Sequence, residues 1–253
     1  SLVNPGDEVI VPMPYWVSYI EIIKLAEGIP VTIPSTVQSN FKISAEQLKK
    51  AITPKTKMIV FSTPCNPSGS VYNKAELKAL AEVIVQYPDL YVISDEIYEY
   101  INFVGAHESI AQFDFIYDRV ITVNGVSKGY AMTGWRIGYI GAPQWIALGC
   151  EKVQGQFTSG TCSISQMAAM EAIKADPSVT DVMRDTFKKR RDLVLGLLKE
   201  IPGVKANVPD GAFYVFPDVS YYYGKSYENY HIKNSFDLSI FLLMEGNIAL
   251  VSG

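Results

Sequence analysis

The stretch Met58-Ile-Val-Phe-Ser-Thr-Pro-Cys-Asn-Pro-Ser-Gly69 sets the pattern for the whole chain. It begins as a continuous apolar run and then changes into a turn rich in proline, serine and glycine. A short apolar run without polar alternation is typical of a strand that is buried on both faces. The turn after it places polar side chains where the strand ends.

The same pattern recurs along most of the chain. We expect further strands at Val9–Met13, Pro30–Ile33, Leu90–Ser94, Val120–Asn124 and Ile137–Gly141. Helical patterns alternate with them at Trp16–Ala26, Ser44–Ala51, Lys74–Gln86, Pro143–Val153 and Ser163–Ala175. This alternation predicts an α/β fold with a mostly parallel, doubly wound sheet.

The character of the sequence changes after Asp176-Pro177. A long amphipathic helix is expected over Val179–Glu200, followed by a hairpin of 204–208 with 212–216, a tyrosine-rich loop, a helix at 236–245 and a last strand at 248–251. We therefore predict a large domain over residues 1–176 and, over 177–253, a connecting helix with an incomplete smaller α+β domain. The chain opens in a turn that leads straight into a strand, so we expect a piece of a longer protein that lacks both ends.

Composition excludes several classes of function. The chain has 253 residues, with 22 Lys+Arg against 26 Asp+Glu and a formal net charge of −4. This mild negative charge gives no reason to expect binding to nucleic acid or to a membrane surface. No signal-peptide pattern is visible, and three scattered cysteines fit a reducing, cytoplasmic compartment. The two histidines are far from each other in sequence, so no metal site is predicted, and the basic run 188–191 is interpreted as a solvated helix face.

Polar side chains follow three of the expected strands. Asn66 comes after the strand at 58–62, Asp95 and Tyr98 come after 90–94, and Lys128 comes after 120–124. Ligands of open parallel sheets bind at the carboxyl ends of the strands. We therefore expect an amide, a carboxylate, a phenol and an amine to meet at one edge of the sheet.

This set of groups suits one cofactor, pyridoxal 5′-phosphate. Its aldehyde requires an amine, which Lys128 supplies, and its pyridine nitrogen stays protonated beside a carboxylate such as Asp95. The ring hydroxyl requires donors such as Asn66 and Tyr98.

The cofactor's phosphate requires positive charge and backbone N–H groups. Arg136 supplies a guanidinium, and Gly125 and Ser127 are small residues that allow close backbone approach. These three residues lie in the same segment as Lys128.

Four motifs, in order, resemble those of class I/II aminotransferases, which are pyridoxal-phosphate enzymes of fold type I. The segment Gly125–Gly138 resembles the family's lysine-attachment signature along its whole length. Asn66–Gly69, Ser94–Tyr98 and Pro209–Tyr214 match further motifs, and Pro14–Tyr19 is similar to the aspartate aminotransferase branch. The resemblance covers essentially the whole chain.

The resemblance implies a role for each matched residue. Lys128 forms the imine with the cofactor and, once displaced by the substrate amine, moves the proton. Asp95 pairs with the pyridinium nitrogen, Tyr98 and Asn66 bond the ring oxygen, and Arg136 holds the phosphate, with Ser127 beside it. Trp16 covers the ring face and lines the substrate site, and Asn66 also lies near the substrate carboxylate.

The implied activity is a ping-pong transfer of an amino group between an L-amino acid, aspartate-like or aromatic, and a 2-oxo acid. The family's homodimeric state is implied in the same way. The glycine/serine phosphate loop, the arginine for the substrate carboxylate and a tyrosine from the partner subunit are expected outside residues 1–253, so we expect little activity from this chain alone.

Three alternatives stay open at this point. A C–S lyase of the same fold would use the same residues on another substrate. A sensing domain of a regulator would bind the cofactor without turnover, and an inert folded piece would not bind it.

Overall fold

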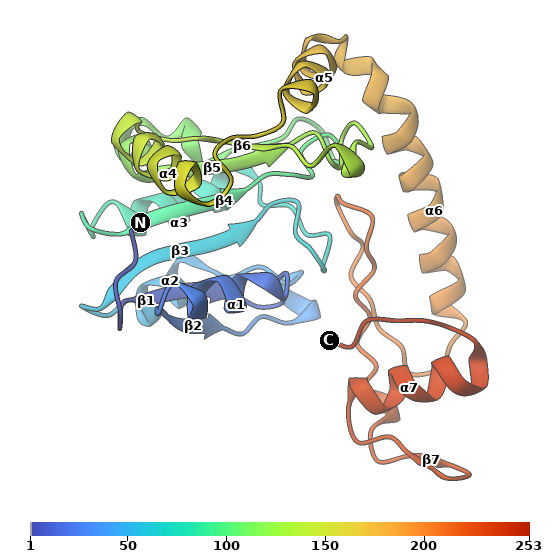
Figure 1. Ribbon diagram of the computed structural model, residues 1–253. Coiled ribbons are helices and arrows are strands. Elements are labelled where there is room, and N and C mark those ends of the chain that lie inside the picture. The colour runs from blue at the N-terminus through green and yellow to red at the C-terminus, as the bar shows by residue number, and fades with distance from the viewer. Residues whose placement is uncertain (1) are drawn as a thin grey trace.

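The computed structural model describes residues 2–253 and contains a six-stranded sheet in the order β2-β1-β3-β4-β5-β6 (Figure 1). The strands are β1 (Glu8–Pro12), β2 (Ile29–Ile33), β3 (Thr56–Ser62), β4 (Tyr91–Asp95), β5 (Val120–Gly125) and β6 (Gly138–Gly141). The first five are mutually parallel, and β6 is antiparallel to β5. All six strands predicted before residue 176 and the mostly parallel α/β architecture are confirmed.

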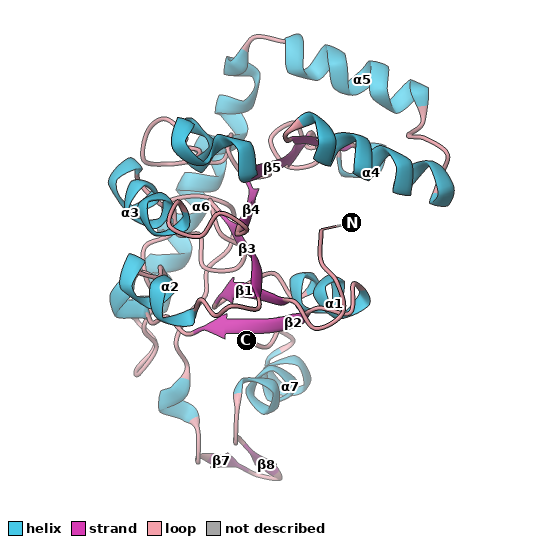
Figure 2. Ribbon diagram, turned by 90° about the vertical axis from the view of Figure 1, so that its left-hand side faces the viewer, coloured by secondary structure: helices cyan, strands magenta, loops and turns pink. Residues whose placement is uncertain are grey.

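Helices cover both faces of the sheet, as the doubly wound architecture requires. They are α1 (Ser18–Leu25), α2 (Ala45–Ala51), α3 (Lys74–Ile84) and α4 (Gln144–Phe157), whereas α5 (Ser163–Lys174) lies beyond the sheet at the top of Figure 1. Figure 2 shows α2 and α3 on one side of the sheet and α1 and α4 on the other. Short 3-10 helices occur at Val37–Ser39, Ile110–Gln112, Asp114–Arg119, Thr133–Trp135, Pro177–Thr180 and Ser220–Tyr222.

The core consists of two apolar layers separated by the sheet. Ile10 and Ile59 lie in the larger cluster with Leu48 and Leu80 of α2 and α3. Val9 and Val11 lie in the smaller cluster with Tyr19 and Ile23 of α1. Neighbouring residues of β1 therefore point into opposite layers, which explains why its sequence is continuously apolar.

The predicted start of α2 is confirmed in detail. Ser44 Oγ accepts a hydrogen bond from the Gln47 backbone N–H at 3.2 Å, and Gln47 Oε1 accepts one from the Ser44 N–H at 2.9 Å. This reciprocal capping satisfies two backbone donors that the first helical turn leaves free.

The second half of the chain consists of a long helix and a small terminal unit. Helix α6 (Asp181–Lys199) runs from the end of α5 to the unit that holds β7 (Ser226–Tyr227), β8 (Tyr230–His231) and α7 (Ser235–Gly246) (Figure 1). The sheet and its covering helices thus precede the predicted boundary at residue 176, and the division into two domains stays a prediction. Nowhere in residues 2–253 is a helix both long enough and apolar enough to cross a bilayer.

Two predicted elements of this second half are wrong. Residues 204–216 do not form a hairpin: Lys205 pairs with Asp218 instead, and Gly211 forms an isolated bridge to Asn102 in the large unit. Residues 248–251 are not a strand. The apolar pattern near residue 212 predicts a local hairpin. The backbone of this segment instead forms hydrogen bonds with the turn after β4, which is distant in sequence.

Two apolar surfaces are less buried than the sequence predicts. All four residues of β6 are exposed, although the fold places strands between helix layers. On α6, Met183 and Phe187 pack against a buried cluster, whereas Val182 is 76% exposed and Leu193 64%. The predicted apolar stripe of α6 is therefore covered only on part of its length.

Candidate active site

Three strand ends bring the predicted residues to one rim. Asp95 is the last residue of β4, and the sheet register pairs it with Ser62 of β3 and with Val123 of β5. Asn66 follows β3 after four residues, and Lys128 follows β5 after three. This register places the three residues at the same edge of the sheet, where they were expected.

The carboxylate of Asp95 is held by two hydrogen bonds. Tyr19 Oη of α1 donates to Oδ2 at 2.5 Å, and the Ile97 backbone N–H donates to Oδ1 at 3.2 Å. Burial raises the pKa of Asp95 above its ordinary value, and the positive charge of Lys128 acts against this rise. Within residues 2–253, Asp95 belongs to no salt bridge, so its oxygens are oriented without a cation in contact.

Lys128 lies beside two aromatic rings at this rim. Its Nζ is 5.9 Å from the centroid of the Tyr98 ring and 5.7 Å from that of Phe213. Among the described residues the amine makes neither a hydrogen bond nor an ion pair, so its hydrogens are available to a ligand. Gly129 lets the turn approach Tyr100, since a Cβ at position 129 would lie 2.6 Å from that ring.

Asn66 and Tyr98 share a partner that the sequence analysis did not single out. Tyr214 Oη lies 2.6 Å from Tyr98 Oη and accepts a hydrogen bond from Asn66 Nδ2 at 3.3 Å. The signal for Tyr214 was present, because it closes the motif Pro209–Tyr214. The second residue missed was Tyr19, which closes Pro14–Tyr19 in the same way.

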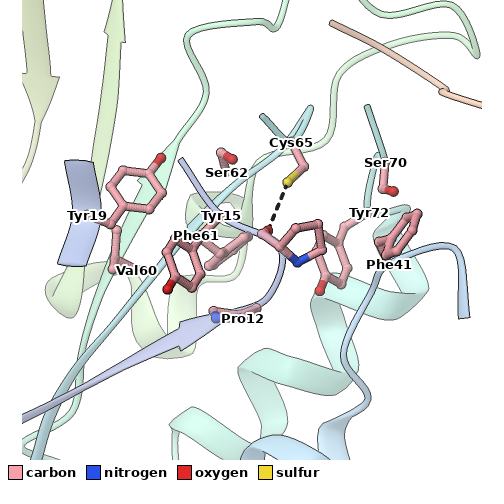
Figure 3. A pocket seen from close by; sticks show the side chains of 11 residues that line it. Pro12, Tyr15, Tyr19, Phe41, Val60, Phe61, Ser62, Cys65, Ser70 and Tyr72 are labelled. Carbon is pink, nitrogen blue, oxygen red and sulfur yellow. Dashed lines mark hydrogen bonds between the residues drawn. The ribbon is translucent and has the colours of Figure 1, made fainter. Parts of the chain in front are cut away.

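A small cavity beneath the rim joins the segment 12–19 to the loop that carries Asn66. Figure 3 shows Tyr15, Tyr19, Ser62 and Cys65 around it. The Cys65 thiol donates to the Pro14 carbonyl at 3.6 Å, and burial raises the pKa of this thiol. The thiol therefore serves as a neutral packing group that connects the two segments.

The side chains of three further predicted residues form no hydrogen bond or ion pair with the side chain of Lys128 or Asp95 in the described part of the chain. The Trp16 ring is 42% exposed and packs edge-on against Tyr19, with 5.6 Å between centroids. Ser127 is half-buried, and the exposed Arg136 donates from Nη1 to the Thr133 carbonyl at 2.8 Å. Their roles toward a ring face and a phosphate stay predictions.

A histidine that looked isolated in sequence has carboxylate neighbours in space. His107 Nε2 lies 2.8 Å from Glu96 Oε2, and the possible ligand atoms of Glu96, Glu99 and His107 all lie within 4.8 Å of one another. The expectation of an isolated His107 is therefore wrong. Glu96 Oε1 accepts hydrogen bonds from Ser94 at 2.8 Å and Ser109 at 2.7 Å, whereas His107 Nδ1 is buried without a partner among the described residues.

The donor set of the rim fits pyridoxal 5′-phosphate. A half-buried carboxylate without a contacting cation suits a protonated ring nitrogen, and an unpaired lysine amine suits an aldehyde. Asn66 and Tyr98 add an amide and a phenol for the ring oxygen. The residues present thus match the chemical groups of the cofactor ring.

Comparison with known proteins places the chain. The family model for aminotransferase class I and II matches residues 1–253. The chain belongs to this family. Its members use pyridoxal 5′-phosphate, and the fold is the family's fold type I.

Individual relatives agree with this assignment. A "bifunctional aspartate aminotransferase and glutamate/aspartate-prephenate aminotransferase" of Petunia hybrida is 43% identical over 258 residues, which cover 100% of this chain and 54% of the relative. An "aspartate/prephenate aminotransferase" of Cereibacter sphaeroides is 43% identical over 263 residues, covering 100% of this chain and 64% of the relative. The chain therefore spans between about half and two thirds of the length of these relatives.

Solved structures show the same fold. The aspartate aminotransferase of Rhizobium meliloti superposes with a TM-score of 0.94 at 40% identity, covering 98% of this chain and 63% of that one. The Thermus thermophilus aspartate aminotransferase with maleate gives a TM-score of 0.90 at 38% identity, covering 99% and 63%.

Proposed function

We propose that this chain is the central part of a pyridoxal-phosphate-dependent aminotransferase that moves an amino group between an L-amino acid and a 2-oxo acid. The observation that carries the proposal is the position of Asp95 and Lys128 at the ends of the neighbouring strands β4 and β5, with the Lys128 amine 5.9 Å from the centroid of the Tyr98 ring. Family membership over all residues supports it.

In this proposal each side chain of the rim has one task. When bound, the cofactor supplies an electron-withdrawing ring that stabilises negative charge at the substrate's α-carbon. Lys128 holds the cofactor and then takes and returns the α-proton at its Nζ. Asp95, oriented by Tyr19, keeps a proton on the ring nitrogen, and the indole of Trp16 shields the ring from water.

The aromatic surroundings of the Lys128 amine fit its proposed task. The aromatic rings of Tyr98 and Phe213 lie beside the amine without occupying its hydrogens. A cofactor that binds to this amine therefore does not have to displace a carboxylate from it.

The decisive experiment labels the lysine. Borohydride reduction of the protein with pyridoxal 5′-phosphate, followed by peptide mapping, should place the label on Lys128 and give no label there in Lys128→Ala. Lys152 of the exposed helix α4 is a suitable comparison, and Lys152→Ala should label as the unchanged protein does. Labelling spread over surface lysines would contradict the proposal.

The names of the relatives suggest the first substrates to test. Aspartate and glutamate as amino donors, with oxaloacetate, 2-oxoglutarate and prephenate as acceptors, form the initial panel. Cysteine conjugates belong in the same panel, because release of pyruvate and thiol without amino transfer would instead indicate a C–S lyase.

We also propose a homodimer in the cytoplasm, with no resident metal. Exposed apolar side chains on α4, α5 and α6 support a protein partner, and three free cysteines suit a reducing compartment. Sedimentation velocity of the purified protein tests the dimer, and metal analysis tests the absence of a resident metal.

A further inference from the structure

Tyr214 reaches the rim from the segment beyond α6 and contacts both residues assigned to the ring oxygen. We infer that Tyr214 is a positioning residue for the cofactor's ring hydroxyl, acting through Tyr98 and Asn66. The inference rests on the proposed function, because it concerns how the cofactor is held.

The three polar groups form a connected set. Asn66 Nδ2 donates to Tyr214 Oη at 3.3 Å, and Tyr214 Oη lies 2.6 Å from Tyr98 Oη. A hydroxyl has one hydrogen, and either of the two phenols can donate in this pair; with a cofactor oxygen beside Tyr98, the inferred arrangement has Tyr214 donating to Tyr98 Oη. The hydrogen of Tyr98 is then free for the ring oxygen, and a phenol that receives a hydrogen bond donates its own more strongly.

Backbone contacts fix Tyr214 in place. The N–H groups of Asp210 and Gly211 both donate to the Gly69 carbonyl, at 2.8 and 2.9 Å, and the Ala212 N–H donates to the Ile101 carbonyl at 2.7 Å. The segment is thus bonded to the loop of Asn66 and to the turn of Tyr98. The position of the Tyr214 hydroxyl follows from both attachments.

The surroundings keep Tyr98 a donor. Its side chain is buried, and burial raises the pKa of Tyr98, so its phenol stays protonated. Phe213 packs edge-on against the Tyr98 ring with 5.3 Å between centroids. Removing only the Tyr214 oxygen therefore leaves the ring packing intact.

Tyr214→Phe tests the inference with two probes, pyridoxal 5′-phosphate and its analogue lacking the 3-hydroxyl. Dissociation constants are measured by cofactor absorbance and by quenching of tryptophan fluorescence. We expect pyridoxal 5′-phosphate to bind about fivefold more weakly, the effect of one lost hydrogen bond, and the analogue to bind as before. Tyr227→Phe, at an exposed tyrosine of the same segment, should change neither value.

Three results would overturn the inference. Equal weakening of both probes would show a merely structural role, unchanged binding would show no role, and tighter binding would show that the hydroxyl competes with the ring oxygen. If the unchanged protein binds neither probe, the proposed function falls and this inference with it, so the two failures are distinguishable.

Discussion

Asp95 illustrates how a residue placed for function weakens the fold. Its carboxylate is desolvated beneath the rim and receives hydrogen bonds from Tyr19 and from the Ile97 backbone, yet no cation touches it in the described chain. Burial that exceeds this compensation raises the pKa of Asp95. Ionisation of the Asp95 carboxyl is therefore less favourable in the folded chain than in water.

Asp95→Asn should stabilise the cofactor-free protein at neutral pH. Because the pKa of Asp95 is raised on folding, the folded state binds more protons than the unfolded state, and stability falls as the pH rises from about 4 through the raised pKa. The amide of Asn does not ionise, so this loss of stability is absent in the variant and its urea midpoint should be higher at pH 7. Near pH 3 Asp95 is protonated in both the folded and the unfolded state, so the difference from the unchanged protein should vanish.

Urea titrations at several pH values measure this effect, with Asp89→Asn at an exposed position as the control. Cofactor binding should weaken in Asp95→Asn at the same time. A lower midpoint at neutral pH would contradict the argument.

At the scale of elements, the segment 207–214 forms hydrogen bonds with both the large unit and α6. Arg191 of α6 donates from Nη1 to the Pro209 carbonyl at 2.8 Å, and its guanidinium lies 4.9 Å from the centroid of the Phe103 ring. Its side chain is only 13% exposed, so the prediction of a fully solvated basic face at 188–191 is wrong for this residue. Charge pattern alone did not show that one of the four cations faces inward.

Gly69→Ala should weaken the attachment of the segment 207–214 to the large unit. Gly69 has φ of +67°, and a Cβ there would lie 2.4 Å from Pro209 Cβ, so the substitution adds a steric clash to the conformational cost. We expect a loss of more than about 1 kcal/mol of unfolding free energy and faster hydrogen exchange at 209–214.

Gly224→Ala is the matched control, because Gly224 has φ of +84° but open space around its Cβ position. It should show the conformational cost alone, with exchange at 209–214 unchanged. Equal losses in the two variants would show that the approach to Pro209 does not matter.

For the whole molecule, sequence predicted the parts that depend on local pattern. The six strands of the sheet, the helix that begins after Ser44 and the common rim of Asn66, Asp95 and Lys128 follow from periodicity and from the rule for parallel strands. The contacts of Tyr214 and Arg191 join segments that are far apart in sequence, and no local pattern encodes them. The same reason explains the wrong hairpin at 204–216, whose backbone partners lie near residues 69 and 101.

The uncovered apolar residues of α6 predict self-association. Leu193 and Leu197 are 64% and 54% exposed, which is costly for a stable surface unless a partner covers them. Replacing both with lysine should lower the weight-average mass in sedimentation equilibrium at micromolar concentration. Exchanging the exposed Lys189 for glutamine should leave that mass unchanged.

The exposed strand β6 has a consequence for handling the protein. Its backbone pairs with β5 on one side and with no other strand among residues 2–253, so a row of amide and carbonyl groups is open to solvent. An unpaired edge strand can form hydrogen bonds with strands of other molecules, and repeated pairing of this kind builds cross-β fibrils. Preparations of this polypeptide should accordingly form thioflavin-positive fibrils on warming, and a proline introduced at Tyr139 should slow their appearance.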